Sequence, residues 1–325
     1  MRAILCHAYG LPDQLRIEDI PDPVPGKGQV LIAVEACGLG FVDGLLVQGK
    51  YQVKDPLPFV PGGEMAGRVL AVGEGVSPDL VGKRVAGLGK GGLAEKAVLP
   101  AAACAVLPDV FDSAAAASAL INYCTAVYGF EDCGKVRPGE TVLVLGASGG
   151  VGMAAIDVAR GFGATVIAAA STEDKRAACL ARGAAHAVDY TQPDWRKTLE
   201  GLVGGKGVDL VYDPVSGPWS ETAFRCLAPG GRHLVIGFAS GEIARLPLNL
   251  ALLKRASLVG VDWGGHVRAH VDEGRRLTAR LIELVEQGRI SPRPDSLHPL
   301  ADAPGVLGDL LNRRAVGKPV IQPSI

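Results

Sequence analysis

Residues 141–152 of this chain read TVLVLGASGGVG, an apolar run that ends in closely spaced glycines. The run 141–145 predicts a strand that is buried in a parallel sheet. The turn 146–152 then leads into a helix that we expect to begin near Met153 and to run through Ala159. Because the N-terminus of a helix presents unpaired N–H groups and the positive end of its dipole, small residues at this place favour the binding of a phosphate.

Dinucleotide-binding turns commonly carry the spacing G-x-G-x-x-G between a strand and a helix. Here Ala147 stands at the first glycine of that spacing, and Gly149 and Gly152 match the other two. An ordinary tight turn is the alternative, but the strand before it and the helix after it favour a nucleotide site. The residues expected around the pyrophosphate are Ala147, Ser148, Gly149, Gly150, Val151 and Gly152.

The chain has 325 residues and a formal net charge of -1 at pH 7. This length is sufficient for two domains, each with its own core. The near-neutral charge gives no reason to expect nucleic acid as a partner. No apolar stretch reaches the roughly 18 residues that span a bilayer, and the N-terminus MRAILCHAYG lacks the pattern of a signal peptide. We therefore expect a cytoplasmic protein without a membrane partner.

Seven cysteines are spread along the chain, and no two of them have C-x-x-C spacing. A structural zinc site or a redox pair is therefore not expected. The six histidines are also dispersed, and none is assigned a catalytic role.

The pattern of the chain changes near Ser113, from short β-branched runs to helical periodicity. Short strands joined by turns indicate a β-rich domain at the N-terminus. From Thr141 onward strands and helices alternate, which predicts an α/β fold with a doubly wound parallel sheet. A single long helix is expected over 267–287. The predicted parts are residues 1–120, residues 121–262, and a C-terminal segment 263–325 that returns to the first domain. The predicted strands are 29–36, 67–72, 84–87, 94–99, 141–145, 165–169, 187–189, 210–213 and 233–238, and the predicted helices of the second part are 153–161, 173–182 and 217–226.

Five sequence segments of the chain resemble those of a known family. They are VEACGLGFVDGLLVQGKY (34–51), LPFVPGGEMAGRV (57–69), GETVLVLGASGGVGMAAIDVA (139–159), GA-x-H-x-V-D-Y (183–190) and NRRAVGKPV (312–320). Together they make the chain resemble the zinc-independent medium-chain dehydrogenases/reductases, and most closely the NADPH:quinone oxidoreductases. The resemblance implies a GroES-like substrate domain and a Rossmann domain that binds NADPH.

Zinc-dependent relatives in that superfamily carry a cysteine and a histidine at the places of Gly40 and Gly63. Glycine has no side chain to coordinate a metal, so no metal site is expected. Without a Lewis acid, the easier reaction is hydride transfer to an acceptor that is already electron-poor, such as a quinone or an enone.

The choice of nicotinamide cofactor depends on the end of the second strand of the parallel sheet. NAD-binding domains place an acidic residue there, about 20 residues after the glycines. This chain has Ala170 and Ser171 instead, although Glu173 and Asp174 follow closely. The absent carboxylate, Ser171 and the cation of Lys175 favour NADPH, and the resemblance adds Tyr190 as a contact of the 2′-phosphate.

Other cofactor contacts follow from the topology, because ligands of doubly wound sheets lie at the carboxyl ends of the strands. This rule indicates that Asp213, Gly237 and Phe238 line the cofactor site. The alternative is that each is a turn residue with a structural role. By resemblance, Thr125 lies near the nicotinamide, and Arg313, or its neighbour in NRRAVGK, reaches the cofactor from the C-terminal segment.

The reacting end of the site has one candidate proton donor, Tyr51, which matches a tyrosine of quinone oxidoreductases by resemblance. A phenol is protonated at neutral pH and so is able to donate a proton. A packing tyrosine, or a proton from solvent, is the alternative. Asp43 is expected to anchor the fold rather than to act as a base.

The sequence therefore predicts an NADPH-dependent, metal-free oxidoreductase that reduces a quinone or an activated C=C of an enone. A reductase of short enoyl-CoA esters is the alternative within the same class. An NADPH-binding sensor or RNA-binding protein with little turnover is the alternative of another class. We also expect a homodimer, with an edge strand supplied by HLVIGFASG (233–241) or by the following segment LPLNLALLKRASLVGVDWG (246–264).

Overall fold

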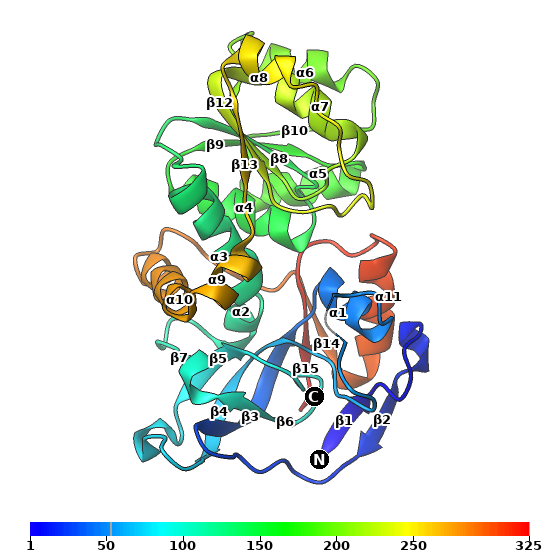
Figure 1. Ribbon diagram of the computed structural model, residues 1–325, viewed down its shortest axis with the longest axis vertical. Coiled ribbons are helices and arrows are strands. Elements are labelled where there is room, and N and C mark those ends of the chain that lie inside the picture. Colours follow the sequence, from blue (N-terminus) through cyan, green and yellow to red (C-terminus); the bar gives the residue numbers. More distant parts are fainter. Residues whose placement is uncertain (53, 325) are drawn as a thin grey trace. The chain divides into compact units, whose positions relative to one another are not determined.

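The computed structural model describes residues 1–52 and 54–324, which form two compact units (Figure 1). The first unit comprises Met1–Ile121, Thr278–Glu286 and Pro292–Ile325. The second unit comprises Asn122–Leu277 and Gln287–Ser291. Each unit is built around its own sheet.

The first unit holds a seven-stranded mixed sheet in the order β14-β15-β3-β4-β5-β7, with β6 paired to β3. Its central strand β3 alternates between buried and half-buried residues, so one face packs on the core. The C-terminal strand β15 is antiparallel to β3, with Ile321 opposite Cys37. The strands are β3 (Gln29–Gly38), β4 (Glu64–Val72), β5 (Arg84–Leu88), β6 (Lys96–Pro100), β7 (Cys104–Val106), β14 (Ser296–Pro299) and β15 (Pro319–Gln322).

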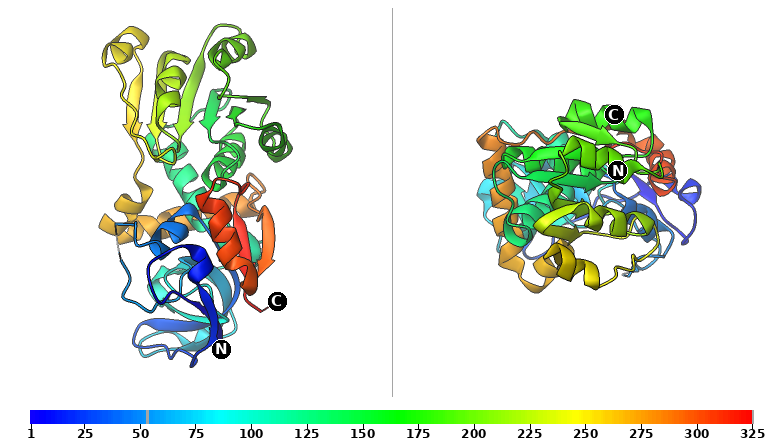
Figure 2. Two further views of the ribbon diagram at one scale, coloured as in Figure 1. Left: turned by 90° about the vertical axis from the view of Figure 1, so that its right-hand side faces the viewer. Right: turned by 90° about the horizontal axis from the view of Figure 1, so that it is seen from above.

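Short helices and an antiparallel strand pair complete the first unit. Helix α11 packs against α1, as Figure 2 also shows, and the contact is close because Gly44 lies under the side chain of Leu311. The elements are β1 (Arg2–Leu5), β2 (Arg16–Asp19), α1 (Phe41–Val47), α2 (Ser113–Ala117) and α11 (Ala303–Leu311), with 3₁₀ turns at Pro12–Gln14, Pro78–Leu80, Ala101–Ala103 and Leu300–Asp302.

The second unit holds a six-stranded sheet, parallel throughout, in the order β10-β9-β8-β11-β12-β13. The chain leaves β8 toward one edge and later returns to the other side of β8, so the order of the strands reverses between β8 and β11. In doubly wound sheets ligands bind at this reversal, beyond the carboxyl ends of the strands. The strands are β8 (Thr141–Leu145), β9 (Thr165–Ala169), β10 (His186–Val188), β11 (Val208–Asp213), β12 (Leu227–Val235) and β13 (Ser257–Gly260).

Helices pack on the parallel sheet and bury its apolar strands. Helix α4 contacts β8 and β9, and α7 contacts β11 and β12. One core cluster joins Leu143, Ile167 and Val211 of the strands to Phe224 of α7. The helices of the second unit are α4 (Gly150–Gly161), α5 (Glu173–Arg182), α6 (Trp195–Leu202), α7 (Pro218–Arg225), α8 (Asn249–Lys254) and α9 (Trp263–Ala269), with a π-helical turn at Tyr128–Cys133. Helices α3 (Leu120–Val127) and α10 (Val271–Glu286) have residues in both units.

The predicted α/β class and parallel sheet are confirmed, and β8, β9 and α5 have the predicted bounds. The helix after β8 was predicted to start near Met153, three residues too late. Gly149 is the extended residue that precedes the helix (φ -80°, ψ 168°), so α4 starts at Gly150. The predicted strand 233–238 was also wrong in its bounds, since β12 runs over Leu227–Val235.

The predicted long helix over 267–287 is two helices. Asp262 starts α9 by accepting a hydrogen bond from the N–H of Gly265 at 2.7 Å. His270 then leaves the helical conformation (φ -134°, ψ 83°) before α10 begins. Within the described residues, no helix is both long enough and apolar enough to cross a membrane.

The start of α4 gives a direct test of the fold. A Cβ at Gly152 would lie 2.5 Å from the carbonyl oxygen of Gly146 and 2.6 Å from the Cα of Ala147, both backbone atoms. We expect Gly152→Ala to lower the free energy of unfolding by about 1–3 kcal/mol, because the helix must move away from the turn.

Gly149→Ala is the matched control in the same turn. Its Cβ would meet nothing closer than 3.5 Å, and Gly149 has a negative φ. We expect a change of about 0.5 kcal/mol or less. Urea unfolding of the two variants measures the difference, and equal stabilities would contradict the close backbone approach.

Candidate functional site

The turn after β8 presents unpartnered N–H groups at the N-terminus of α4. Gly146 has a positive φ of 56°, and the N–H of Ala147 donates to the carbonyl of Ala169 at 3.1 Å. Among the hydrogen bonds of the described residues, none involves the N–H of Gly150, Val151 or Gly152. Three such donors at the positive end of a 12-residue helix suit a pyrophosphate, so the residues present fit a dinucleotide.

The turn after β9 carries no carboxylate at positions 170–172. Thr172 caps α5, since its hydroxyl oxygen accepts a hydrogen bond from the N–H of Lys175 at 3.3 Å. The acidic residues Glu173 and Asp174 follow on the exposed first turn of α5. Ser171 and Lys175 lie on either side of the capping residue Thr172.

Sequence reasoning missed Arg176, which joins the turn after β9 to the turn after β10. Its guanidinium donates to the carbonyl of Ala170 at 3.2 Å and pairs with Asp189 at 3.1 Å. Asp189 directly precedes Tyr190, whose ring packs edge-on against Trp219 of α7 at 4.9 Å. Ser171, Lys175 and Tyr190 thus follow the carboxyl ends of the neighbouring strands β9 and β10.

Asp213, at the end of β11, is 2% exposed and is directed into its own turn. Its Oδ1 accepts hydrogen bonds from the N–H groups of Val215 and Ser216 at 2.9 and 2.8 Å. Burial opposes ionisation of this carboxyl group, but the hydrogen bonds, that of His233 first, outweigh it and lower the pKa of Asp213. Two roles were considered for Asp213, a cofactor contact and a turn residue. The structure supports the second, because the side chain binds backbone N–H groups of its own turn.

The turn after β12 lies against the turn after β11. The N–H groups of Ala239 and Ser240 donate to the carbonyls of Pro214 and Val215 at 3.1 and 2.9 Å. Gly237 is half-buried, whereas Phe238 is 52% exposed. Phe238 therefore offers an apolar surface at the carboxyl edge of the sheet.

The remaining predicted residues lie outside this edge. Thr125 is buried in α3 of the second unit. Tyr51 and Arg313 belong to the first unit, where Tyr51 is half-buried in the bend after α1 and Arg313 is exposed after α11.

Asp43 anchors two backbone segments of the first unit. Its carboxylate accepts hydrogen bonds from the N–H of Gly40 at 2.8 Å and from the N–H of Gly63 at 3.2 Å. The expected anchoring role is confirmed. Gly40 and Gly63, whose N–H groups bind Asp43, have no side chain that could ligate a metal. The described residues contain no group of three or more His, Cys, Asp or Glu side chains able to hold a metal ion.

Beside Asp43 lies a buried ion pair, between Lys318 and Glu64. The ammonium of Lys318 donates to Glu64 Oε2 at 2.6 Å, and the N–H of Ile121 donates to Glu64 Oε1 at 3.0 Å. Both carboxyl groups are buried with only one cation. Burial therefore raises the pKa of Asp43 and of Glu64, against the opposing charge of Lys318.

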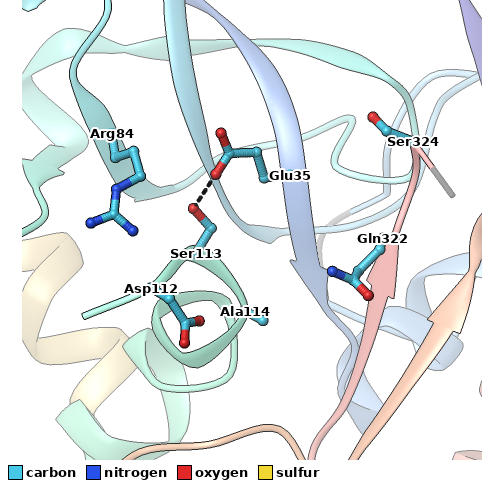
Figure 3. A pocket seen from close by; sticks show the side chains of 7 residues that line it. All are labelled: Glu35, Arg84, Asp112, Ser113, Ala114, Gln322 and Ser324. Carbon is cyan, nitrogen blue, oxygen red and sulfur yellow. Dashed lines mark hydrogen bonds between the residues drawn. The ribbon is translucent and has the colours of Figure 1, made fainter. Parts of the chain in front are cut away.

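A pocket of about 510 Å³ also lies in the first unit, between the start of α2 and strands of the mixed sheet (Figure 3). The hydroxyl of Ser113 donates to Glu35 across it. Its lining holds none of the predicted site residues. The lining residues are Glu35, Arg84, Asp112, Ser113, Ala114, Gln322 and Ser324.

Two family models match the chain. The model described as an alcohol dehydrogenase GroES-like domain matches residues 26–109, and that described as a zinc-binding dehydrogenase matches residues 150–280. The fold and the two matches define a medium-chain dehydrogenase/reductase with a GroES-like and a Rossmann unit, as predicted.

Similar proteins share nearly the whole chain. Quinone oxidoreductase-like protein 2 of Bos taurus is 37% identical over 320 residues, covering 98% of this chain and 91% of that protein. A probable oxidoreductase from Mycobacterium abscessus is 36% identical with a TM-score of 0.89, covering 99% of both chains. The Escherichia coli quinone oxidoreductase complexed with NADPH is 27% identical with a TM-score of 0.87, covering 99% of this chain and 100% of that one. The chain belongs to the quinone oxidoreductase family and is an oxidoreductase.

The buried ion pair predicts a large effect of Lys318→Met. The substitution leaves two carboxyl groups buried without a cation, and we expect a loss of about 3–5 kcal/mol in the free energy of unfolding. Lys27→Met is the control, since Lys27 pairs with Glu74 where both side chains are more than three-quarters exposed (79% and 78%). We expect it to cost less than about 1 kcal/mol. Chemical denaturation measures both, and a small loss for Lys318→Met would contradict a structural role of the pair.

Proposed function

We propose that this protein is an NADPH-dependent reductase that delivers hydride to a quinone. The observation that carries the proposal is the arrangement of backbone N–H groups and side chains at the carboxyl edge of the parallel sheet. The N–H groups of Gly150, Val151 and Gly152 lie in the same unit as the turn 170–172, which carries no carboxylate. Lys175 follows on the first turn of α5. The NADPH complex of the Escherichia coli relative supports this assignment of the cofactor.

Bound NADPH would supply the hydride, and the residues of the chain would hold and orient it. The N–H groups of Gly150, Val151 and Gly152 would bind the pyrophosphate. Ser171, Lys175 and Tyr190 would bind the 2′-phosphate, which distinguishes NADPH from NADH. Gly237, Phe238, Thr125 and Arg313 complete the proposed set of cofactor contacts.

The acceptor follows from what the first unit lacks at Gly40 and Gly63. Neither residue has a side chain that ligates a metal, so we propose a reaction without Lewis-acid assistance. An acceptor that is already electron-poor meets this condition, and quinones and enones both qualify. Tyr51 is the proposed proton donor to the reduced oxygen.

The proposed function is tested by oxidation of NADPH and of NADH with ortho-quinones, para-quinones, enones and acryloyl-CoA as acceptors. We expect turnover with NADPH and a quinone, and a lower KM for NADPH than for NADH. Lys175→Ala should raise the KM for NADPH by about tenfold or more, because a charged hydrogen bond contributes about 1.5–3 kcal/mol.

The same assay separates the rival functions. Turnover of acryloyl-CoA alone would identify an enoyl-CoA reductase, and binding of NADPH without turnover of any acceptor would favour a sensor. Tyr51→Phe should lower kcat with little change in the KM for NADPH. An unchanged kcat would assign the proton to solvent.

We also propose a homodimer, formed through the edge of the parallel sheet at β13. This edge and the adjoining α8 segment expose large apolar side chains that a monomer would leave in water. Their exposed fractions are 85% for Leu248, 78% for Leu252, 73% for Leu253 and 56% for Leu258.

The double variant Leu252→Glu/Leu253→Glu should shift the protein from dimer to monomer, because each dimer would bury four added carboxylates in one apolar contact. Val24→Glu is the control, since Val24 is 84% exposed and lies in the other unit. Sedimentation velocity measures the oligomeric state. A dimer that persists in the double variant would move the interface elsewhere.

A further inference from the structure

A buried histidine lies beneath the turn after β11, and the proposed function does not use it. His233 of β12 and Asp213 of β11 are each 2% exposed. The Nε2 of His233 lies 3.0 Å from Asp213 Oδ2, and the ring stacks on Phe224 with centroids 5.9 Å apart. The two strands pair in parallel, with His233 opposite Val211 in the register.

The hydrogen bonds fix the role of His233 as a donor. The Asp213 carboxylate accepts four hydrogen bonds, two from backbone N–H groups at Oδ1 and one each from Ser220 (2.5 Å) and His233 at Oδ2. The other ring nitrogen of His233, Nδ1, is buried without a hydrogen-bond partner. A ring that carries a proton on Nε2 satisfies the hydrogen bond to Asp213.

The carboxylate in turn fixes a turn that would otherwise be strained. Ser216, whose N–H binds Asp213, has a positive φ of 61°, and the next residue, Gly217, has a positive φ of 74°. For a serine this conformation costs free energy, which the surrounding contacts must offset. The hydroxyl of Ser216 also accepts a hydrogen bond from the N–H of Ala244 at 3.0 Å.

The turn 213–217 contacts two other parts of the carboxyl edge. Val215 lies against the glycine-rich turn, since a Cβ at Gly146 would be 2.5 Å from its Cγ2. The carbonyls of Pro214 and Val215 accept hydrogen bonds from the turn after β12. A shift of turn 213–217 would therefore displace both neighbours of the proposed dinucleotide site.

We propose that His233 is a positioning residue for NADPH: through its hydrogen bond to Asp213 it holds turn 213–217 against Gly146 and against the turn after β12. His233 does not itself contact the cofactor. The inference rests on the proposed binding of NADPH. It predicts that loss of the hydrogen bond weakens NADPH binding and leaves the KM for the quinone unchanged.

Two substitutions at His233 separate its hydrogen bond from its packing. His233→Phe keeps an aromatic ring against Phe224 but removes the donor, whereas His233→Gln keeps an N–H donor near the place of Nε2. Calorimetric titration with NADPH, at a temperature well below the unfolding temperature of each variant, measures the dissociation constant. We expect His233→Phe to raise it about tenfold or more and His233→Gln to restore it to within about threefold, since a hydrogen bond to a charged group is lost in the first only.

The outcomes distinguish the inference from the proposed function. If the wild-type chain does not bind NADPH, the proposed function fails and the inference fails with it. If the wild type binds NADPH and folded His233→Phe binds it equally well, only the inference is overturned, whatever the loss of stability. Equal weakening in both variants, or a rise in the KM for the quinone as large as that for NADPH, would also overturn it.

Ser220→Ala keeps the test decisive if His233→Phe does not fold. It removes the other side-chain donor to Asp213 Oδ2, from a buried serine that is 6% exposed. We expect the dissociation constant for NADPH to rise about threefold or more, because one hydrogen bond to a buried carboxylate is lost. Wild-type affinity in this variant would overturn the inference.

Discussion

The close approach of α4 to the turn that precedes it is the constraint on which the proposed cofactor site depends. The backbone at Gly152 lies so near Gly146 and Ala147 that no Cβ fits between them. This approach places the first turn of α4 directly after β8, with its N–H groups unpartnered. A side chain at position 152 would push the helix away from the turn, so Gly152 is required by the close approach of the backbone and not only by chain flexibility.

Each unit also buries charge, and the two cases differ in how the charge is compensated. Asp213 has a full set of four hydrogen-bond donors, which keeps it ionised and fixes turn 213–217. Asp43 and Glu64 share one cation, Lys318, and burial raises the pKa of both carboxyl groups. Asp43 and Asp213 each bind backbone N–H groups outside the regular elements, so their common effect is to hold these segments in one conformation.

The parallel sheet was predictable from sequence because its strands are buried and read as apolar runs, as in 141–145 and 165–169. The break at His270 was not, because the helical periodicity continues across it and only backbone angles show the end of α9. The glycines of the turn after β8 were enough to predict a cofactor site there. Tyr51, Tyr190 and Arg313 were predicted as site residues only from the family resemblance. His233 escaped notice because its partner lies 20 residues earlier and meets it only through the register of β11 and β12.

Hydrogen–deuterium exchange of the chain with and without NADPH reports which amides the cofactor protects. We expect slower exchange with NADPH in peptides covering 146–153, 213–217 and 237–241, and no change in the strand pair 2–19. Protection confined to other regions, such as the pocket lined by Glu35 and Arg84, or no protection at saturating NADPH, would contradict the proposed cofactor site.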